Sequence, residues 1–207
     1  MKVLIACEYS GVVREAFRRL GHNAISCDLL PTDIPGPHIQ SDVLEVLEDG
    51  WDLLIAHPPC TYLCSSGLHW NHRVPGRDKL THDAVLFVLN LMGEGFISHN
   101  IQRIALENPI GCLSTKYRKP DQIIQPYEFG DNASKKTCLW LKNLPPLVPT
   151  AHIPGRRVLY SGKTVERWNN QTDSGQNRLG PSETRGLERS RTYQGIADAM
   201  AAQWVIL

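Results

Sequence analysis

The stretch MKVLIACEYSGVVREAFRRLGHNAISCD, residues 1–28, decides the fold class. Residues 2–7 (KVLIAC) are a continuous apolar run of the length of one buried strand. Residues 12–20 then place apolar side chains at helical spacing, and residues 23–28 (NAISCD) predict a second strand. A strand, a helix and a strand in succession favour two parallel strands joined by a right-handed crossover.

The same alternation continues along the chain. We expect strands at 38–42, 52–56, 101–106 and 136–141, and helices at 43–47, 78–99 and 188–204. Residues 150–187 have little periodicity, so we expect a loop or partial disorder there. The predicted fold is one α/β domain over residues 1–207, with a doubly wound, mostly parallel sheet. Such sheets bind ligands outside the carboxyl ends of their strands.

Composition indicates a globular protein without a membrane span. Apolar residues make up 42% of the 207 residues and charged residues 21%, and no apolar run reaches bilayer length. The first residues lack the pattern of a signal peptide, because Glu8 interrupts a short apolar run. We therefore expect a cytoplasmic protein, in the bacterial host if it is phage-encoded, with its six cysteines as thiols.

The charge is unevenly distributed. Residues 151–192 contain eight Lys and Arg against four acids, which gives +4, and since the whole chain is +1 the rest is −3. A basic segment beside a slightly acidic core suits contact with nucleic-acid phosphates, although a solvated loop would have the same composition. We treat residues 151–189 as a basic, loop-rich insertion that contacts substrate.

One cysteine stands at the end of a predicted strand. In His57-Pro58-Pro59-Cys60 the two prolines restrict the backbone, so the thiol leaves the strand end in a fixed direction. A thiolate that adds to carbon 6 of a cytosine makes carbon 5 nucleophilic enough to accept a methyl group. Glu107, at the end of the next predicted strand, could face the thiol and hydrogen-bond ring N3 as charge develops.

Two further strand ends carry features of a nucleoside site. Gly11 lies where a strand turns into a helix, and a glycine there lets the backbone approach a ligand closely. Asp28 ends the second strand, where an acid can accept both hydroxyls of a ribose. An ordinary tight turn and a turn-capping acid are equally consistent with these two residues.

The ordered motifs resemble those of the DNA cytosine-5 methyltransferase family, and the whole chain is most similar to short phage-encoded cytosine-methyltransferase-like proteins. The matching motifs are Glu8-Tyr9-Ser10-Gly11, Asp28, Ser41-Asp42, Pro58-Pro59-Cys60, Glu107-Asn108-Pro109 and the closing stretch 191–204 (RTYQGIADAMAAQW). The resemblance covers residues 1–110 and 190–205 and implies a Rossmann-like, class I methyltransferase fold.

The resemblance also implies roles for individual residues. Cys60 would be the covalent nucleophile and Glu107 its acid partner, acting on DNA. S-adenosylmethionine would be bound by Glu8, Ser10, Gly11, Asp28, Asp42 and Pro58, with Gln194 and Gly195 closing the pocket. The substrate would be contacted by Asn108, Pro109, Lys135, Lys136, Arg189 and Arg191. No metal is expected.

The chain departs from the family pattern in several places. His57 replaces a glycine, Thr61 replaces a glutamine, and the first motif reads Tyr-Ser-Gly instead of Phe-Ala-Gly. The Gln-x-Arg-x-Arg motif and a large target-recognition domain are not recognisable. The substrate could therefore be a free cytidine nucleotide, tRNA or single-stranded DNA, or the protein could bind cofactor or DNA without turnover.

Two other classes remain as alternatives. Amino-group methyltransferases share the sheet and a Pro-Pro-aromatic motif, but they need no thiol, and here Cys60 follows the prolines. A structural zinc site could use side chains of suitable type that lie close together in the sequence. They are His57, Cys60, Cys64, His69 and His72.

Overall fold

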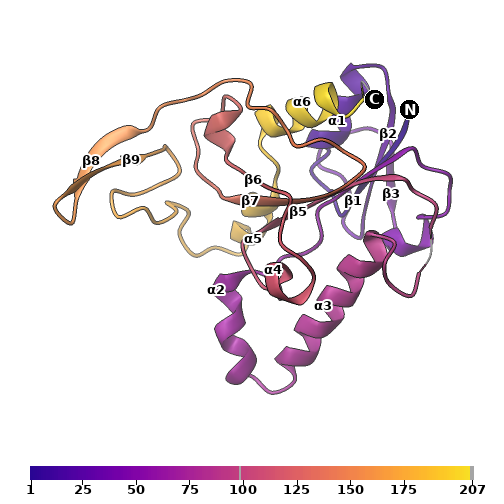
Figure 1. Ribbon diagram of the computed structural model, residues 1–207, viewed down its shortest axis with the longest axis horizontal. Coiled ribbons are helices and arrows are strands. Elements are labelled where there is room, and N and C mark those ends of the chain that lie inside the picture. Colours follow the sequence, from indigo (N-terminus) through magenta and orange to yellow (C-terminus); the bar gives the residue numbers. More distant parts are fainter. Residues whose placement is uncertain (98, 206–207) are drawn as a thin grey trace.

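A computed structural model describes residues 1–97 and 99–205 (Figure 1). Seven strands form one sheet in the order β3-β2-β1-β4-β5-β7-β6, and two more form a separate hairpin, β8–β9. The strands are β1 (Lys2–Ala6), β2 (Asn23–Asp28), β3 (His38–Gln40), β4 (Leu53–Ala56), β5 (Arg103–Pro109), β6 (Gln122–Ile124), β7 (Thr137–Lys142), β8 (Arg156–Tyr160) and β9 (Lys163–Arg167). The helices are α1 (Val12–Arg19), α2 (Ser65–Leu68), α3 (Arg77–Leu91), α4 (Leu113–Lys116), α5 (Arg185–Ser190) and α6 (Gln194–Gln203), with short 3₁₀ turns η1 (Val43–Glu45), η2 (His69–His72) and η3 (Pro126–Glu128).

The sheet is mostly parallel. β3, β2, β1, β4 and β5 pair in parallel, whereas β7 pairs antiparallel with both β5 and β6. The strand order reverses between β1 and β4, and such a switch point leaves a crevice at the carboxyl ends of the strands. The predicted fold class, a doubly wound, mostly parallel α/β sheet, is confirmed.

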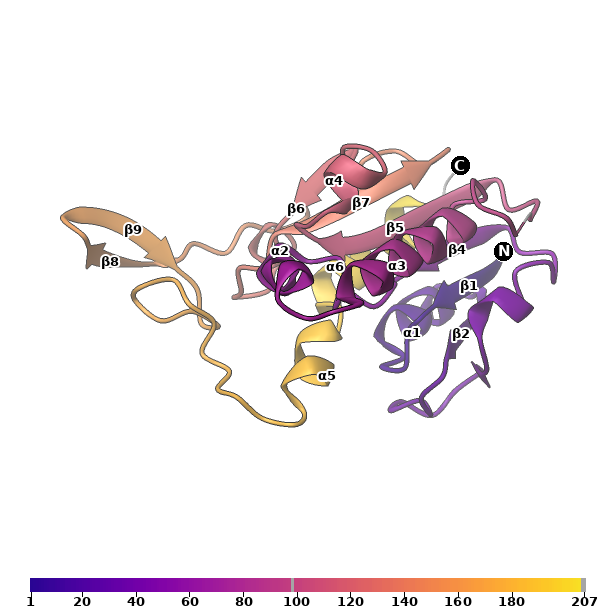
Figure 2. The same ribbon diagram turned by 90° about the horizontal axis from the view of Figure 1, so that it is seen from below.

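Helices cover both faces of the sheet. α1 and α6 pack together on one face, while α3 and α4 lie on the other (Figures 1 and 2). Strand side chains alternate, so Val3 and Ile5 of β1 enter the core beneath α1 and α6, and Leu4 and Ala6 enter the core beneath α3. This two-sided burial explains why β1 reads as a continuous apolar run.

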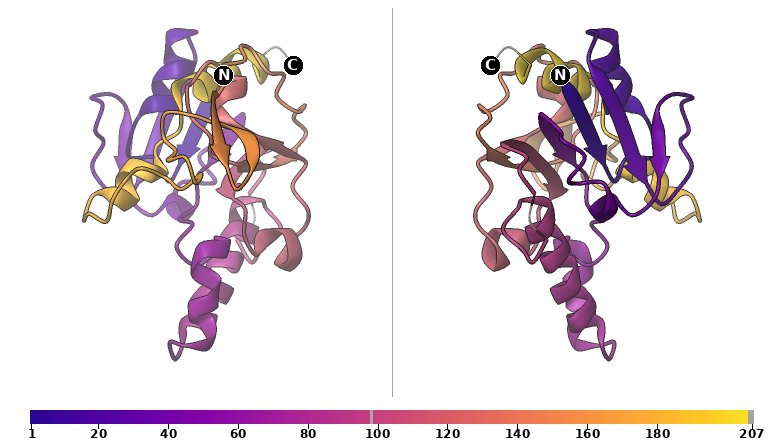
Figure 3. Two further views of the ribbon diagram at one scale, coloured as in Figure 1. Left: turned by 90° about the vertical axis from the view of Figure 1, so that its left-hand side faces the viewer. Right: turned by 90° about the vertical axis from the view of Figure 1, so that its right-hand side faces the viewer.

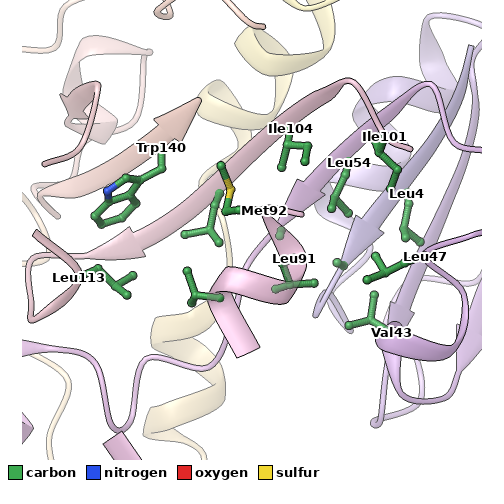
Figure 4. Packing of buried hydrophobic residues seen from close by; sticks show 14 of the residues in the cluster. Leu4, Val43, Leu47, Leu54, Leu91, Met92, Ile101, Ile104, Leu113 and Trp140 are labelled. Atoms are coloured by element: carbon green, nitrogen blue, oxygen red, sulfur yellow. The ribbon is translucent and has the colours of Figure 1, made fainter. Parts of the chain in front are cut away.

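The larger core lies between the sheet and α3. Figure 4 shows Leu91 and Met92 of the α3 end reaching the sheet, with Leu4, Leu54 and Trp140 around them. Each fully buried side chain of this size contributes about 1.5–3 kcal/mol relative to an exposed one. The strand ends that carry the candidate site therefore rest on a rigid scaffold.

Two predicted helices have other bounds. The helix expected at 78–99 ends at Leu91, because Gly93 adopts a left-handed backbone (φ 71°) that stops it. The helix expected at 188–204 is two helices, α5 and α6, separated by extended backbone at Arg191 and Tyr193. We call residues 185–192, which comprise α5 and the start of this break, the strap.

The basic insertion is more ordered than the expected loop. Within residues 150–187 the structure contains the β8–β9 hairpin, which extends from the body in Figures 1 and 2. Ser161 and Gly162 at its tip both have positive φ (49° and 74°), as a two-residue hairpin turn requires. At its base the Trp168 ring stacks on Tyr127 with centroids 4.0 Å apart, which anchors the hairpin to the body.

A second projection is helical. α2, η2 and the first turns of α3 extend beyond the sheet in the direction away from the chain ends (Figure 3). Trp70 on this arm is 46% exposed, and Arg73 lies over its ring at 5.7 Å. No helix among the described residues is both long and apolar enough to span a membrane.

Candidate active site

The sequence motifs meet at one edge of the sheet. β1, β2, β4 and β5 are parallel, so their carboxyl ends lie side by side. Tyr9 and Ser10 follow β1, Asp28 ends β2, Cys60 follows β4, and Glu107 lies near the end of β5. These residues share the crevice side of the sheet, although they are far apart in the sequence.

Two hydrogen bonds join the ends of β4 and β5. Ala56 pairs with Leu106 in the register, so His57 and Glu107 are the next neighbours, and His57 Nδ1 lies 2.9 Å from Glu107 Oε2. Asn108 Nδ2 donates to the carbonyl of Pro58 over 2.8 Å. These contacts hold His57 and Pro58, at the start of the loop that carries Cys60, against the end of β5.

Glu107 is buried and its environment favours the carboxylate. Burial by itself raises the pKa of Glu107, but the positive charge of Lys135 and hydrogen bonds from His57 and Thr137 outweigh burial and hold the pKa below its usual range. Lys135, which the resemblance predicts to contact substrate, therefore lies close enough for its positive charge to act on Glu107. Its Nζ also donates to the carbonyl of Arg189 in the strap (3.0 Å).

Cys60 and Cys64 form a thiol pair. The S–H of Cys60 hydrogen-bonds to Cys64, which raises the pKa of Cys60, and burial raises it further. The same hydrogen bond lowers the pKa of Cys64 to about 5, and the hydroxyl of Ser66 and backbone N–H groups at the start of α2 add to this. Within this pair, the shared hydrogen bond favours the charged form of Cys64 and the protonated form of Cys60.

Glu8 and Ser10 build the turn after β1. Glu8 is buried, and its two carboxylate oxygens accept from the backbone N–H groups of Val13 (2.6 Å) and Arg14 (3.2 Å). Ser10 donates to Glu8 as well. Gly11 is left-handed (φ 75°), a conformation that favours glycine. Glu8 therefore caps α1 in this structure.

The two expected cofactor acids also make local contacts. Asp28 Oδ1 accepts from the backbone N–H of Leu30 (2.9 Å), and Asp42 Oδ1 accepts from that of Leu44 (3.0 Å). Both are turn contacts. Asp28 lies at the end of β2 and Asp42 follows β3, which are the positions that the resemblance implies. In the structure each acid makes a turn contact with the backbone two residues further on.

The expected closing residues lie at the start of α6. Gln194 donates to Asp198 on the same helix, and the Gly195 N–H donates to Asp131 (2.9 Å for both). A Cβ on Gly195 would lie 1.8 Å from the carbonyl oxygen of Phe129, so this glycine permits close packing. Neither residue lines the small cavity at the strand ends; the strap does so instead.

That cavity lies between the strand ends and the strap. It is lined by Cys7, Glu8, Tyr9, Ser10, His57, Ser190, Arg191 and Thr192. Its volume is about 30 Å³, whereas sites for ligands of nucleoside size and above span roughly 300–1,000 Å³. A nucleoside can enter only if the strap moves. The strap is held by Tyr9, whose hydroxyl donates to the Leu187 carbonyl (2.7 Å), and by the ion pair of Arg191 with Asp33.

Within residues 1–97 and 99–205, the cavity offers one unpartnered polar atom and one aromatic face to a ligand. His57 lines the cavity, and its Nε2 is buried without a hydrogen-bond partner among the described residues. Such an atom is costly unless a ligand or water supplies its partner. Tyr9, which lies under the Arg191 guanidinium at 6.0 Å, adds an aromatic face to the same cavity.

The remaining predicted substrate residues are dispersed. Pro109 is the last residue of β5 and pairs with Thr137, which leaves it in the sheet. Lys136 is exposed beside Lys135, and Arg189 is exposed on α5. Of the predicted substrate residues in the strap, only Arg191 lines the cavity.

The candidate zinc ligands do not assemble. In the part of the chain that the structure describes, no three His, Cys, Asp or Glu side chains are grouped so as to hold a metal ion. His57 instead forms a hydrogen bond with Glu107, while His69 and His72 lie on the projecting arm. All six cysteines lie within the described residues and are free thiols.

Sequence reasoning missed the contacts that assemble the site. One sequence feature could have indicated the hydrogen bond between His57 and Glu107. His57 directly follows β4, and Glu107 occupies the matching position on the parallel neighbour β5. Cys64 had the signal of spacing, because four residues after Cys60 it lies one helical turn away, and its N–H donates to the Cys60 carbonyl (2.9 Å). The anchoring of the strap on Tyr9 and Asp33 had no sequence signal that we recognise.

Comparisons with known proteins give limited guidance. No protein-family model matches the chain, and no curated protein matches its sequence. Among solved structures it is similar to a DNA modification methyltransferase encoded within a prophage of E. coli, with 14% identity, a TM-score of 0.46, and coverage of 74% of this chain and 52% of that one. It is also similar to a methyltransferase of Entamoeba histolytica, with 16% identity, a TM-score of 0.45, and coverage of 73% and 57%.

The chain thus spans about half the length of these two structures. At these scores the similarities carry no argument about the chain's activity. The fold rests on its own strand order and pairing, and the function rests on the site.

Proposed function

We propose that this chain transfers a methyl group from S-adenosylmethionine to carbon 5 of a cytosine in DNA, through a covalent adduct on Cys60. The observation that carries the proposal is the joining of the two strand-end loops. Because His57 bonds Glu107 and Asn108 bonds Pro58, the loop that bears the thiol is held against the strand that bears the carboxyl group.

The chemistry needs three functions at this edge. The sulfur of Cys60 adds to carbon 6 of the ring, and the proton that Cys60 gives up goes to its hydrogen-bond partner Cys64 as the C–S bond forms. Glu107 binds the amidine edge of the cytosine at N3 and the exocyclic amine. Lys135 offsets negative charge nearby. The sulfonium of S-adenosylmethionine supplies an electrophilic methyl group, and a base then removes the proton from carbon 5.

The cofactor is expected at the ends of β1, β2 and β4. Tyr9, Ser10 and His57 line the cavity there, and Asp28 stands at the end of β2 for the ribose. Since the cavity is smaller than a nucleoside, we expect binding to displace the strap. Asp28→Ala should weaken cofactor binding, and an unchanged affinity would remove Asp28 from the site.

The exposed hairpin β8–β9 supports DNA as the partner. Arg157, Tyr160 and Lys163 are exposed on it, beyond the body of the molecule. Arg157→Ala with Lys163→Ala should weaken DNA binding and reduce the slope of log K against log salt by roughly 2, about 0.9 for each phosphate contact. Glu166→Gln on the same hairpin is the matched control and should strengthen binding slightly. An unchanged slope in the double variant would exclude the hairpin.

The decisive experiment is trapping with 5-fluorocytosine. Fluorine at carbon 5 blocks the final elimination, so the enzyme should remain bound to the base through Cys60, as peptide mass mapping would show. Parallel reactions with duplex DNA, single-stranded DNA, tRNA and deoxycytidine monophosphate identify the substrate. Cys60→Ala should form no adduct while it still binds the cofactor. An adduct on another residue, or none on any substrate, would refute the proposed chemistry and favour a binding protein without turnover.

A further inference from the structure

His57 is the buried link between the candidate catalytic acid and the cofactor cavity. Its side chain is 7% exposed and that of Glu107 is 9% exposed, and their 2.9 Å contact joins Nδ1 to Oε2. Hydrogen bonds between such groups are stronger in the low dielectric of a buried site than in water. The pair is thus a fixed element of the site and not a surface contact.

The second ring nitrogen of His57, Nε2, lacks a hydrogen-bond partner in the described part of the chain. Nε2 is buried and has no partner among the described residues, while the ring lines the cavity beside Glu8 and Ser10. An imidazole with both nitrogens engaged or available can move a proton from one nitrogen to the other. The ring therefore connects Glu107 on one side with the cavity, and any water or ligand in it, on the other.

The proposed reaction requires Glu107 to donate a proton that its carboxylate form does not carry. Ring N3 of cytosine is a hydrogen-bond acceptor, and it gains electron density when sulfur adds to carbon 6. A carboxylate only accepts hydrogen bonds. Because Lys135 and the bonds from His57 and Thr137 lower the pKa of Glu107, its resting form is the carboxylate and it needs a proton source.

We propose that His57 supplies the proton that Glu107 delivers to N3 of the cytosine, an inference that rests on the proposed function. As the C6–S bond forms, the C5=C6 π pair becomes the C4=C5 bond and the C4=N3 π pair takes a proton from Glu107. Glu107 takes the Nδ1 proton of His57, and Nε2, which has no partner among the described residues, takes a proton from water in the cavity, so the ring stays neutral and changes tautomer. When the thiolate leaves, the N3 proton returns by the same path. His57 acts through Glu107 and is a positioning residue.

Charged or titratable groups from the neighbouring elements lie around this pair. Lys135 precedes β7 and acts on Glu107, Glu8 follows β1, Cys60 belongs to the loop after β4, and Arg191 comes from the strap. Glu8 is already neutralised in part by the two N–H groups of α1 that it caps. The variants made at position 57 must therefore leave these four groups unchanged.

The test compares variants at position 57 by the rate of adduct formation with 5-fluorocytosine in DNA. His57→Asn keeps an N–H donor near the Nδ1 position but cannot be protonated. General acid catalysis contributes about 10²–10⁴-fold, so we expect the limiting rate of adduct formation to be about 100-fold slower or more in this variant, with little change in the DNA concentration that gives half of that rate.

Chemical rescue distinguishes a role of His57 in proton transfer from a purely structural role. His57→Gly leaves room for an added imidazole, and the rescued rate should depend on the pKa of the substituted imidazole used. A rescue that is the same for all imidazoles, or an Asn variant within about twofold of the wild type, overturns the proposal. If His57→Gly does not fold, His57→Gln, which also cannot be protonated, must be as slow as His57→Asn, and a fast Gln variant overturns it.

The wild type in the same assay keeps the two proposals apart. A wild type that forms the Cys60 adduct while His57→Asn forms it equally fast refutes the role of His57 alone. A wild type that forms no adduct refutes the proposed function and this inference with it.

Discussion

Gly111 is the point at which the loop after Cys60 touches the chain after β5. A Cβ at this position would lie 1.9 Å from the carbonyl oxygen of Leu63 and 2.8 Å from the Cα of Cys64. Both are backbone atoms, so no side chain can rotate away. Gly111→Ala must therefore push the two segments apart, and it should break the hydrogen bond from the Cys112 N–H to the Leu63 carbonyl (2.8 Å).

The expected loss of stability follows from these contacts. Overpacking of this kind costs about 1–3 kcal/mol. The Cys112–Leu63 bond and the neighbouring bond from Ser65 to the Ile110 carbonyl add about 0.5–1.5 kcal/mol each. A total of about 4 kcal/mol, the middle of the summed range, would lower Tm by about 8–16 °C for a chain of this size.

Thermal unfolding followed by circular dichroism measures the effect. Gly186→Ala in α5 is the matched control, because no atom lies within 4 Å of its Cβ position and alanine favours a helix. The control should unfold at or slightly above the wild-type temperature. A Tm for Gly111→Ala within about 2 °C of the wild type would refute the close contact between the two loops.

Three further predictions concern the same edge. Iodoacetamide should label Cys64 rapidly at pH 7, and more slowly as pH falls through about 5, because its pKa is lowered to about 5; a rate still rising to pH 8.5 contradicts this. Asn108→Ala should cost about 1–2 kcal/mol in urea unfolding, since the Pro58 carbonyl loses its donor. Glu8→Ala should cost about 1–2 kcal/mol and Glu8→Gln less, because Glu8 caps α1; a solely ligand-binding Glu8 would leave unfolding unchanged.

The strands that carry the site could be predicted because burial on both faces leaves a plain pattern. β1 and β4 read as continuous apolar runs, and their parallel order follows from the helices between them. β6 could not be predicted, because its three residues (QII) become a strand only by pairing with β7. The β8–β9 hairpin was missed since its Ser161-Gly162 turn is a weak signal in a polar segment.

The site shows the same division. That Cys60 and Glu107 approach each other follows from two strand ends in a parallel sheet, which sequence order can predict. Sequence order cannot predict that both carboxylate oxygens of Glu8 accept hydrogen bonds from α1, because this depends on the rotamer of one side chain in the folded turn. The thiol pair of Cys60 and Cys64 depends likewise on a helical turn after two prolines.

The strap has a kinetic consequence. It is tied to the body at Tyr9, Asp33 and Lys135, which come from three separate segments of the chain. We expect a nucleoside to enter when these ties open together, and its association rate should then level off at high ligand concentration, at the frequency with which the strap opens. Substrate and cofactor would then bind in a random order, set by which of them first finds the crevice uncovered.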